Sequence, residues 1–285
     1  MISRTMTKFF SVITVTRNHL AGLKATATSL AQEDTRLFEW IVIDGASTDD
    51  TPAYMPTTNA QWISEPDAGI YDAMNKGLER ATSDYVLFLN AGDTLALPRT
   101  LDTLAALLSA RPVQPDMIYG DAFETSPLCH PGASRNLVDI NMNPIPAYAG
   151  MTTKNNIIIK TARSHKTINQ GLFTHHQAIF YRREVINDLR YDQTYNIAAD
   201  YKFTAQFLRM TKDVLYWPRP ICLFEAGGIS QQQAFKGRMQ QSLIRRELEM
   251  TLPLEELLIL TQQTAAYSLR RIAPKLYWEL RATMA

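Results

Sequence analysis

Residues 38–51 are FEWIVIDGASTDDT, and this stretch decides the class of fold. Its first part, residues 38–43, is aromatic and β-branched, which is typical of a strand buried on both faces. The apolar run stops at Asp44 and Gly45, and a polar segment follows. The stretch therefore predicts a buried strand with a carboxylate at its carboxyl end.

Strands and helices alternate on both sides of this stretch. Strands are expected at residues 9–16, 61–64, 85–89 and 117–119, with helices between them at 19–32, 70–81 and 101–108. Parallel sheets that are covered on both faces have this alternation and such near-continuous apolar strands. The sequence therefore predicts an α/β protein with a mostly parallel sheet flanked by helices.

The predicted strands end in polar residues. These ends are TRN at residues 16–18, DGAS at 44–47, NAGD at 90–93 and GD at 120–121. In open α/β sheets, ligands bind at the carboxyl ends of the strands. Three of the four ends carry a carboxylate, and carboxylates at neighbouring strand ends suit a hard cation such as Mg²⁺ or Mn²⁺.

Composition and motifs exclude several functional classes. A chain of 285 residues, 46% of them hydrophobic, is enough for one large domain, with or without an appendage. The 29 basic and 28 acidic residues give a net charge of +1, which does not favour nucleic acid as a partner. No G-x-G-x-x-G, Walker, H-E-x-x-H or G-x-S-x-G motif occurs. The two cysteines, and the lack of a membrane-length apolar run or signal-peptide pattern, lead us to expect an intracellular protein.

The second half of the chain has a less regular pattern. Residues 128–174 are rich in proline and asparagine, and we expect an irregular, mobile loop over the site. Regular elements are expected again at residues 178–181 and 200–210, so we divide the chain into a domain at 1–230 and a helical region at 231–285. The basic and aromatic tail fits either contact with an anionic membrane surface or ordinary helix packing.

Several segments match one known family in the same order along the chain. They are SVITVTRN (11–18), FEWIVIDGASTDDT (38–51), SEPDAGIYDAMNKG (64–77), LFLNAGD (87–93), HQAIF (176–180), AADY (198–201) and GGIS (227–230). On these segments the chain resembles family 2 glycosyltransferases with the GT-A fold. Within that family it resembles the bacterial exopolysaccharide branch, which includes colanic acid glycosyltransferases. An ordered set of segments is far more specific than any one motif.

The resemblance implies that the first two strand ends bind the nucleoside of a nucleotide-sugar donor, through Asp44, Thr16, Arg17, Asn18 and Ser47. Structural alternatives remain open for these residues. Ser47 and Asp50 match a capping box of the next helix, in which case Asp44 supports the turn. Arg17 is either a group that stacks on the base or an exposed residue at a strand end.

The third strand end is implied to bind the metal, Mn²⁺ or Mg²⁺, through Asp93 and the ribose through Asn90. The family usually has an Asp-x-Asp signature here, whereas this chain has Asn90 and Gly92 in a segment that is also a good turn. This departure leaves a second hypothesis open. In that hypothesis the chain is a catalytically degenerate protein that binds a nucleotide sugar or serves as a scaffold.

A helix between these strand ends is implied to face the donor with Asp67, Asn75 and Lys76, because a basic group offsets the charge of the diphosphate. By pattern alone, Asn75 and Lys76 lie on the polar face of an amphipathic helix, and Asp67 precedes its start.

Asp200 matches the catalytic base of the family, which takes the proton of the attacking sugar hydroxyl. Ala199 stands where the family commonly has a glutamate, and a helix cap is the structural alternative for Asp200. His176 and Gln177 are implied to contact the donor or the acceptor.

Taken together, the resemblance implies a metal-assisted, inverting glycosyltransferase. It would move a sugar from a nucleotide-diphosphate-sugar donor to a lipid-linked glycan acceptor in surface polysaccharide biosynthesis. We expect it in the cytoplasm, in peripheral contact with the inner face of the cell membrane, with residues 128–174 on the acceptor side. A sugar nucleotidyltransferase has a similar sheet, but it needs a glycine-rich basic loop after the first strand, and residues 16–19 are TRNH.

Overall fold

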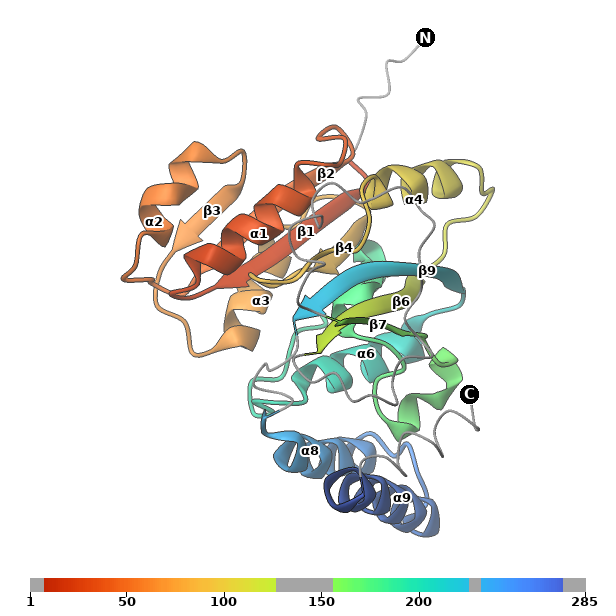
Figure 1. Ribbon diagram of the computed structural model, residues 1–285. Coiled ribbons are helices and arrows are strands. Elements are labelled where there is room, and N and C mark those ends of the chain that lie inside the picture. Colours follow the sequence, from red (N-terminus) through yellow and green to blue (C-terminus); the bar gives the residue numbers. More distant parts are fainter. Residues whose placement is uncertain (1–7, 127–155, 226–231, 274–285) are drawn as a thin grey trace.

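The computed structural model describes residues 8–126, 156–225 and 232–273 (Figure 1). One sheet runs in the strand order β3-β2-β1-β4-β8-β6-β9-β5, and β7 pairs with β6. Its strands are β1 (Phe10–Thr16), β2 (Phe38–Asp44), β3 (Gln61–Ser64), β4 (Tyr85–Phe88), β5 (Thr94–Leu95), β6 (Met117–Ser126), β7 (Asn156–Lys160), β8 (Ile179–Arg182) and β9 (Val214–Glu225).

The helices along the described chain are α1 (Leu20–Leu30), α2 (Thr51–Tyr54), α3 (Ile70–Arg80), α4 (Thr100–Ser109), α5 (Arg183–Ile186), α6 (Ala199–Met210), α8 (Ala234–Glu247) and α9 (Pro253–Ile272). Short 3₁₀ helices are η1 (Met55–Thr57), η3 (His165–Gln170) and η4 (His176–Ala178). Among the described residues, no helix is both long and apolar enough to span a bilayer.

The sheet is parallel in its first half and mixed in its second. Strands β3, β2, β1 and β4 are parallel neighbours. Strand β8 then lies antiparallel between β4 and β6, and β9 runs parallel to β6. The predicted α/β fold is confirmed, but the parallel arrangement is interrupted at β8.

Helices cover both faces of this sheet (Figure 1). On β1, Phe10 and Val12 belong to the core cluster that α1 and α4 complete, whereas Ile13 and Val15 belong to the cluster completed by α3 and α6. Successive side chains of a strand point to opposite faces. Burial of both faces therefore explains why the strand is apolar throughout.

Strand β6 continues beyond its predicted end at Gly120 and Asp121. Its register against β9 shifts on both sides of Asp121, and the Asp121 Oδ1 accepts hydrogen bonds from the Ala162 amide at 2.9 Å and the Tyr216 hydroxyl at 2.8 Å. The prediction that a strand ends here is therefore wrong, because the chain passes through a bulge and stays in the sheet.

The predicted irregular loop at residues 128–174 is wrong in its later part. Residues 127–155 lie outside the described residues, but β7 and η3 follow them, and β7 extends the sheet beside β6. Strand β9 was also not predicted, because Pro218 and Pro220 interrupt its apolar pattern. Both prolines lie where β9 shifts register against β6, which is where a sheet tolerates proline.

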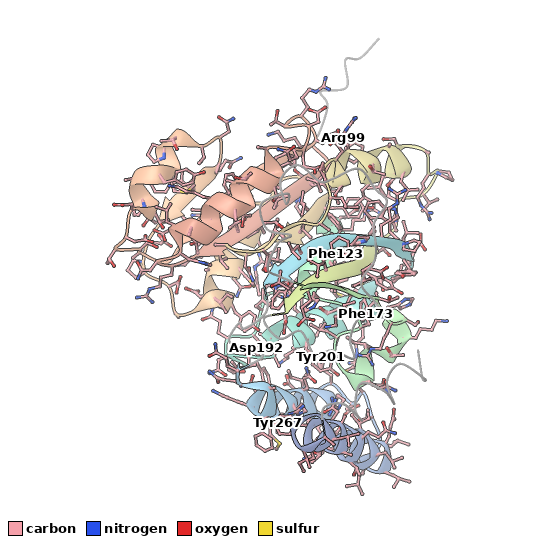
Figure 2. All side chains as sticks on the ribbon, in the orientation of Figure 1. Arg99, Phe123, Phe173, Asp192, Tyr201 and Tyr267 are labelled. Atoms are coloured by element: carbon pink, nitrogen blue, oxygen red, sulfur yellow. The ribbon has the colours of Figure 1, made fainter. Side chains whose placement is uncertain are left out.

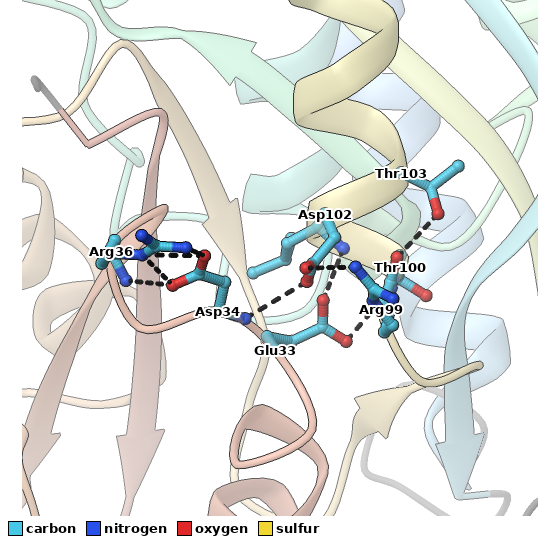
Figure 3. Close-up of polar contacts among 8 residues, drawn as sticks. Glu33, Asp34, Arg36, Arg99, Thr100, Asp102 and Thr103 are labelled. Atoms are coloured by element: carbon cyan, nitrogen blue, oxygen red, sulfur yellow. Dashed lines mark hydrogen bonds and ion pairs between the residues drawn. The ribbon is translucent and has the colours of Figure 1, made fainter.

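The start of α4 is fixed by Glu33, which follows α1 (Figure 3). Its carboxylate accepts hydrogen bonds from the Thr100 amide at 3.1 Å and the Leu101 amide at 2.7 Å. Burial raises the pKa of Glu33 to about 7, in spite of these two bonds. Asp102 adds a contact to the Asp34 amide at 3.2 Å, so α1 and α4 act as one layer.

Helices α8 and α9 pack as a pair below α6 (Figure 1). The Arg245 guanidinium of α8 is fully buried and donates to the Glu256 carboxylate of α9 at 2.6 and 2.8 Å. Arg238 lies over the ring of Tyr267 at 4.4 Å, and Figure 2 shows Tyr267 on this pair of helices. The expected boundary at residue 230, the GGIS segment and the tail residues 274–285 lie outside the described residues.

Glu256→Gln is expected to lower the free energy of unfolding by about 3–5 kcal/mol, because it leaves the Arg245 guanidinium buried without a counter-charge. Urea unfolding at pH 7 measures the loss. Glu184→Gln is the matched control: Glu184 pairs with Arg182 at 2.9 Å, but its side chain is 79% exposed. The control should change stability by less than about 1 kcal/mol, and equal losses in both variants would contradict the prediction.

The ion pair of Arg245 and Glu256 is also expected to make the free energy of unfolding depend on pH. Hydrogen bonding from Arg245 lowers the pKa of Glu256 from 4.5 to about 2. A carboxyl with a lowered pKa stabilises the fold above its ordinary pKa, and this contribution disappears as the pH falls toward the lowered value. The difference between the unmodified protein and Glu256→Gln should therefore narrow from pH 4.5 to pH 2.

Candidate active site

The carboxyl ends of β1 and β2 form the first part of the site. Asp44 is fully buried at the end of β2, and its carboxylate accepts from the Ser47 amide at 3.1 Å, the Ser47 hydroxyl and the Ser64 hydroxyl at 2.6 Å. The Gly45 amide donates to the Thr16 carbonyl at 2.9 Å. The structure thus brings Asp44, Ser47 and Thr16 together at one edge of the sheet, as predicted from the strand ends.

Asn18 connects the two loops at this edge. Its amide donates to the Ser47 hydroxyl at 2.7 Å, and its Oδ1 accepts from the Thr48 amide at 2.7 Å. The alternative of a capping box from Ser47 is wrong, because Asp49 accepts from the Thr51 amide at 3.0 Å at the start of α2. Within the polar run STDD, no feature of the sequence distinguishes Asp49 from its neighbours.

Arg17 and Asp67 flank Gly45 from two sides. A side-chain carbon at position 45 would lie 2.3 Å from the Asp67 Oδ2 and 3.4 Å from the Arg17 Cδ. A side chain at position 45 would therefore displace the Asp67 carboxylate. Asp67 also accepts from the Gly69 amide at 3.0 Å, while Arg17 is exposed.

Asn75 and Lys76 are used by the framework around α3. The Asn75 side chain binds the backbone of Tyr191 twice, at 2.8 and 2.9 Å. The Lys76 ammonium lies 2.8 Å from the Glu65 carboxylate and donates to the Pro66 carbonyl at 2.9 Å. Both side chains thus contact neighbouring parts of the fold, and their contact with the donor stays a prediction.

Asp93 follows β4 and is 94% buried, with an exposed fraction of 6%. Its Oδ2 accepts from the Gln177 side-chain amide at 2.8 Å. The Thr26 hydroxyl of α1 donates to the Asp93 carbonyl at 2.7 Å and accepts from the Gly92 amide at 3.2 Å. Thr26 therefore shapes the NAGD turn, and its only sequence signal is a polar residue among the apolar positions of α1.

His176 and Gln177 contact the two carboxylates that are predicted to act as the base and to bind the metal. Gln177 contacts Asp93, and the Nδ1 of its neighbour His176 lies 3.5 Å from the Asp200 carboxylate at the start of α6. The two neighbouring residues lie in η4, directly before β8. Two carboxylates that are 107 positions apart in the sequence, Asp93 and Asp200, thus belong to one site.

Four polar atoms of this site are buried without a hydrogen-bond partner within the described chain: Thr16 Oγ1, Asn90 Oδ1, His176 Nε2 and Gln177 Oε1. Buried polar atoms are almost always paired, because leaving one unpaired costs about 1–3 kcal/mol. All four belong to residues predicted to bind the donor or the acceptor. Six further atoms of this kind lie at other described residues, so at these four a polar ligand would supply the missing partners.

The segment before Asp200 is held from two sides. The Gln240 side chain of α8 accepts from the amides of Ile197 at 2.9 Å and Ala198 at 3.1 Å, while the Tyr71 hydroxyl of α3 donates to the Ile197 carbonyl at 2.9 Å. Burial, followed by the negative charge of Asp200, raises the pKa of Tyr71, so the Tyr71 hydroxyl stays protonated. Sequence patterns gave no indication of either contact.

The residues at Asp93 suit a divalent cation. The Asp93 carboxylate is a hard oxygen donor, the type that Mg²⁺ and Mn²⁺ prefer. The Asn90 Oδ1, predicted to bind the ribose, has no hydrogen-bond partner among the described residues. Within the part of the chain that the structure describes, no three His, Cys, Asp or Glu side chains form a cluster that could hold a metal.

Comparison with known proteins identifies the class. Residues 11–190 match the family model of glycosyl transferase family 2. The chain is 31% identical over 201 residues to the PGL/p-HBAD biosynthesis glycosyltransferase of Mycobacterium bovis, an alignment that covers 68% of this chain and 67% of that protein. The chain belongs to glycosyl transferase family 2, and it is an enzyme of the glycosyltransferase class.

Solved structures show the same fold. Staphylococcus aureus TarS 1-349 in complex with UDP-GlcNAc is similar with a TM-score of 0.60 and 20% identity, covering 88% of this chain and 69% of TarS 1-349. The mannosyltransferase PcManGT from Pyrobaculum calidifontis, in complex with GDP-Man and Mn²⁺, has a TM-score of 0.57 and 15% identity. The match covers 98% of this chain and 80% of the PcManGT chain. The GT-A fold is confirmed, whereas the exopolysaccharide branch stays a prediction because the relatives named here are not colanic acid enzymes.

Gln240→Leu is expected to speed amide hydrogen exchange at Ile197 and Ala198 by about tenfold, because both amides lose their acceptor. Exchange followed by mass spectrometry on a peptide that spans residues 190–200 measures this. Gln240→Glu replaces the amide oxygen with a carboxylate oxygen that can accept the same hydrogen bonds, and it should exchange as the unmodified protein does. Unchanged exchange in Gln240→Leu would show that α8 does not hold this segment.

Proposed function

We propose that this glycosyltransferase moves a sugar from a nucleoside-diphosphate-sugar donor to a hydroxyl of an acceptor, with inversion at the anomeric carbon. The observation that carries the proposal is the η4 pair: His176 contacts Asp200, and Gln177 contacts Asp93. A base and a group that binds the donor must lie on either side of the reacting carbon. Asp93 and Asp200 are each contacted by one residue of this neighbouring pair.

In the proposed reaction, Asp200 takes the proton of the acceptor hydroxyl as its oxygen attacks the anomeric carbon. Asp200 lies in the first turn of α6, at the N-terminal end of this helix. His176 orients this carboxylate from the side of the donor. Single displacement with one base accounts for inversion.

On the donor side, we propose that Asp93 holds the divalent cation, with Asn90 on the ribose. When bound, such a cation offsets the negative charge of the departing diphosphate. Support for a nucleotide-sugar donor comes from neighbours of the same fold, whose complexes contain UDP-GlcNAc or GDP-Man with Mn²⁺. Thr16, Arg17 and Asp44 are proposed to surround the nucleoside, with Asp67 beside them.

For the acceptor, we propose a lipid-linked glycan of the cell surface, in exopolysaccharide or glycolipid assembly. Support comes from the name of the mycobacterial relative, a PGL/p-HBAD biosynthesis glycosyltransferase. Contact with the inner face of the cell membrane would bring such an acceptor to the site. Exposed leucines of α9 favour this contact: Leu254 is 70% and Leu257 is 60% exposed.

Asp93→Asn is expected to remove the metal-dependent part of nucleotide binding, because a neutral amide is a weaker ligand for a divalent cation. In the unmodified protein, UDP or GDP at a hundredfold excess over Kd, with Mn²⁺, should stabilise the fold by about 2.7 kcal/mol. Thermal unfolding with and without Mn²⁺ measures the difference. Asp50→Asn, an exposed aspartate before α2, serves as the control and should keep the full effect.

Asp200→Asn is expected to lower transfer by about 10²- to 10⁴-fold and to leave nucleotide binding unchanged, because it removes only the base. Release of nucleoside diphosphate in the presence of acceptor measures transfer. Asp188→Asn, an exposed aspartate after α5, is the control. Retained turnover in Asp200→Asn would refute the assignment. Donor binding without any turnover in the unmodified protein would favour the degenerate binding protein instead.

A further inference from the structure

A lysine and a histidine lie beside the candidate site, and the proposed reaction has not used them. Lys160 ends β7, and its Nζ lies 3.3 Å from the Nε2 of His175. The His175 side chain is 13% exposed, and its ring stacks on Phe224 of β9 with a centroid distance of 4.6 Å. The Glu124 carboxylate is 3.9 Å from the same Nε2. His175 directly precedes His176, so this group borders the η4 pair.

The register of the sheet places Lys160 in a row of opposed residues that ends beside the loop of Asp93. Lys160 is opposite Ala122 on β6, Ala122 is opposite Cys222 on β9, and Cys222 is opposite Leu95 on β5. Directly opposed residues present their side chains on the same face. Ala122 and Cys222 are small, fully buried residues on this face of the sheet. Leu95 follows Asp93 by two positions, and the row therefore ends at the loop that carries Asp93.

Electrostatics agree with this path. Burial raises the pKa of the Cys222 thiol, the negative charge of Asp93 raises it further, and the positive charge of Lys160 lowers it. Both charges therefore act on the same buried thiol. Burial and then the charge of Lys160 lower the pKa of His175 to about 3, so the imidazole is neutral and can accept a hydrogen bond from the ammonium group. The positive charge of this group is on Lys160.

We propose that Lys160 binds the diphosphate of the donor and holds the negative charge of the leaving group, oriented by His175. The inference rests on the proposed function. In the transfer, the bond between the anomeric carbon and the diphosphate oxygen breaks, and its electron pair stays on that oxygen. The acceptor oxygen forms the new bond, and its proton goes to Asp200. Lys160 donates a hydrogen bond to a non-bridging oxygen of the diphosphate throughout.

The residues that follow β4 explain why a lysine would be needed at the diphosphate. The segment NAGD has one carboxylate that can bind a cation. The Asp-x-Asp signature that is usual in the family has two. A single carboxylate holds a cation less tightly than two do, so a second positive group at the diphosphate adds to the charge that the cation supplies. A lysine ammonium is suited to this, because it binds phosphate as a compact point charge.

Binding of nucleotides to the full-length protein tests the proposal, measured by isothermal titration calorimetry with UDP, UMP, GDP and GMP in the presence of Mn²⁺. Lys160→Met keeps the length of the side chain and removes the charge. It is expected to bind the preferred diphosphate about tenfold more weakly, with unchanged affinity for the monophosphate. Lys160→Arg keeps the charge and should recover most of the diphosphate affinity. Lys166→Met, an exposed lysine of η3, is the control and should bind as the unmodified protein does.

The outcomes separate this inference from the proposed function. If the unmodified protein binds none of these nucleotides, the proposed donor is wrong and the role of Lys160 is refuted with it. If it binds a diphosphate and Lys160→Met binds that diphosphate equally well, only the role of Lys160 is refuted. Equal weakening toward monophosphate and diphosphate would also refute it, because a contact to the diphosphate end should discriminate between them.

Discussion

The antiparallel position of β8 between β4 and β6 is the constraint on which the site depends. Because β8 runs against β4, it begins at the edge of the sheet where β4 ends. η4 directly precedes β8, so His176 and Gln177 reach the loop with Asp93 and the start of α6 with Asp200. A parallel strand at this position would begin at the opposite edge of the sheet. The segment before it could then not contact Asp93 and Asp200.

The base side of the site also depends on helices beyond the residues that match the family model, which are 11–190. Gln240 of α8 holds the backbone before Asp200, and Lys202 of α6 pairs with Asp192 at 2.6 Å, which Figure 2 labels beside α6. The buried pair of Arg245 and Glu256 joins α8 to α9. The C-terminal helices therefore support the position of the proposed base, in addition to the apolar surface that they expose.

Elements with a strong local pattern could be predicted from the sequence. The strand at residues 61–64 has the predicted bounds, and α3 ends at Arg80, one residue before its predicted end. The second half of the sheet could not be predicted in this way. Strand β9 contains two prolines, and β6 passes through a bulge, so their local patterns indicate loops although pairing between distant strands keeps both in the sheet.

The sequence by itself determined the α/β class, the carboxylates at the strand ends and, through ordered motifs, the family. Local periodicity and short motifs are enough for these, because each depends on residues that are close together in the chain. Only the tertiary structure decided which polar residues share a site. It brought Gln177 to Asp93 and Lys160 to His175, and it turned Asn75 toward the backbone of Tyr191. The direction of a strand and its register against its partners determine these contacts, and the local sequence pattern predicts neither of them.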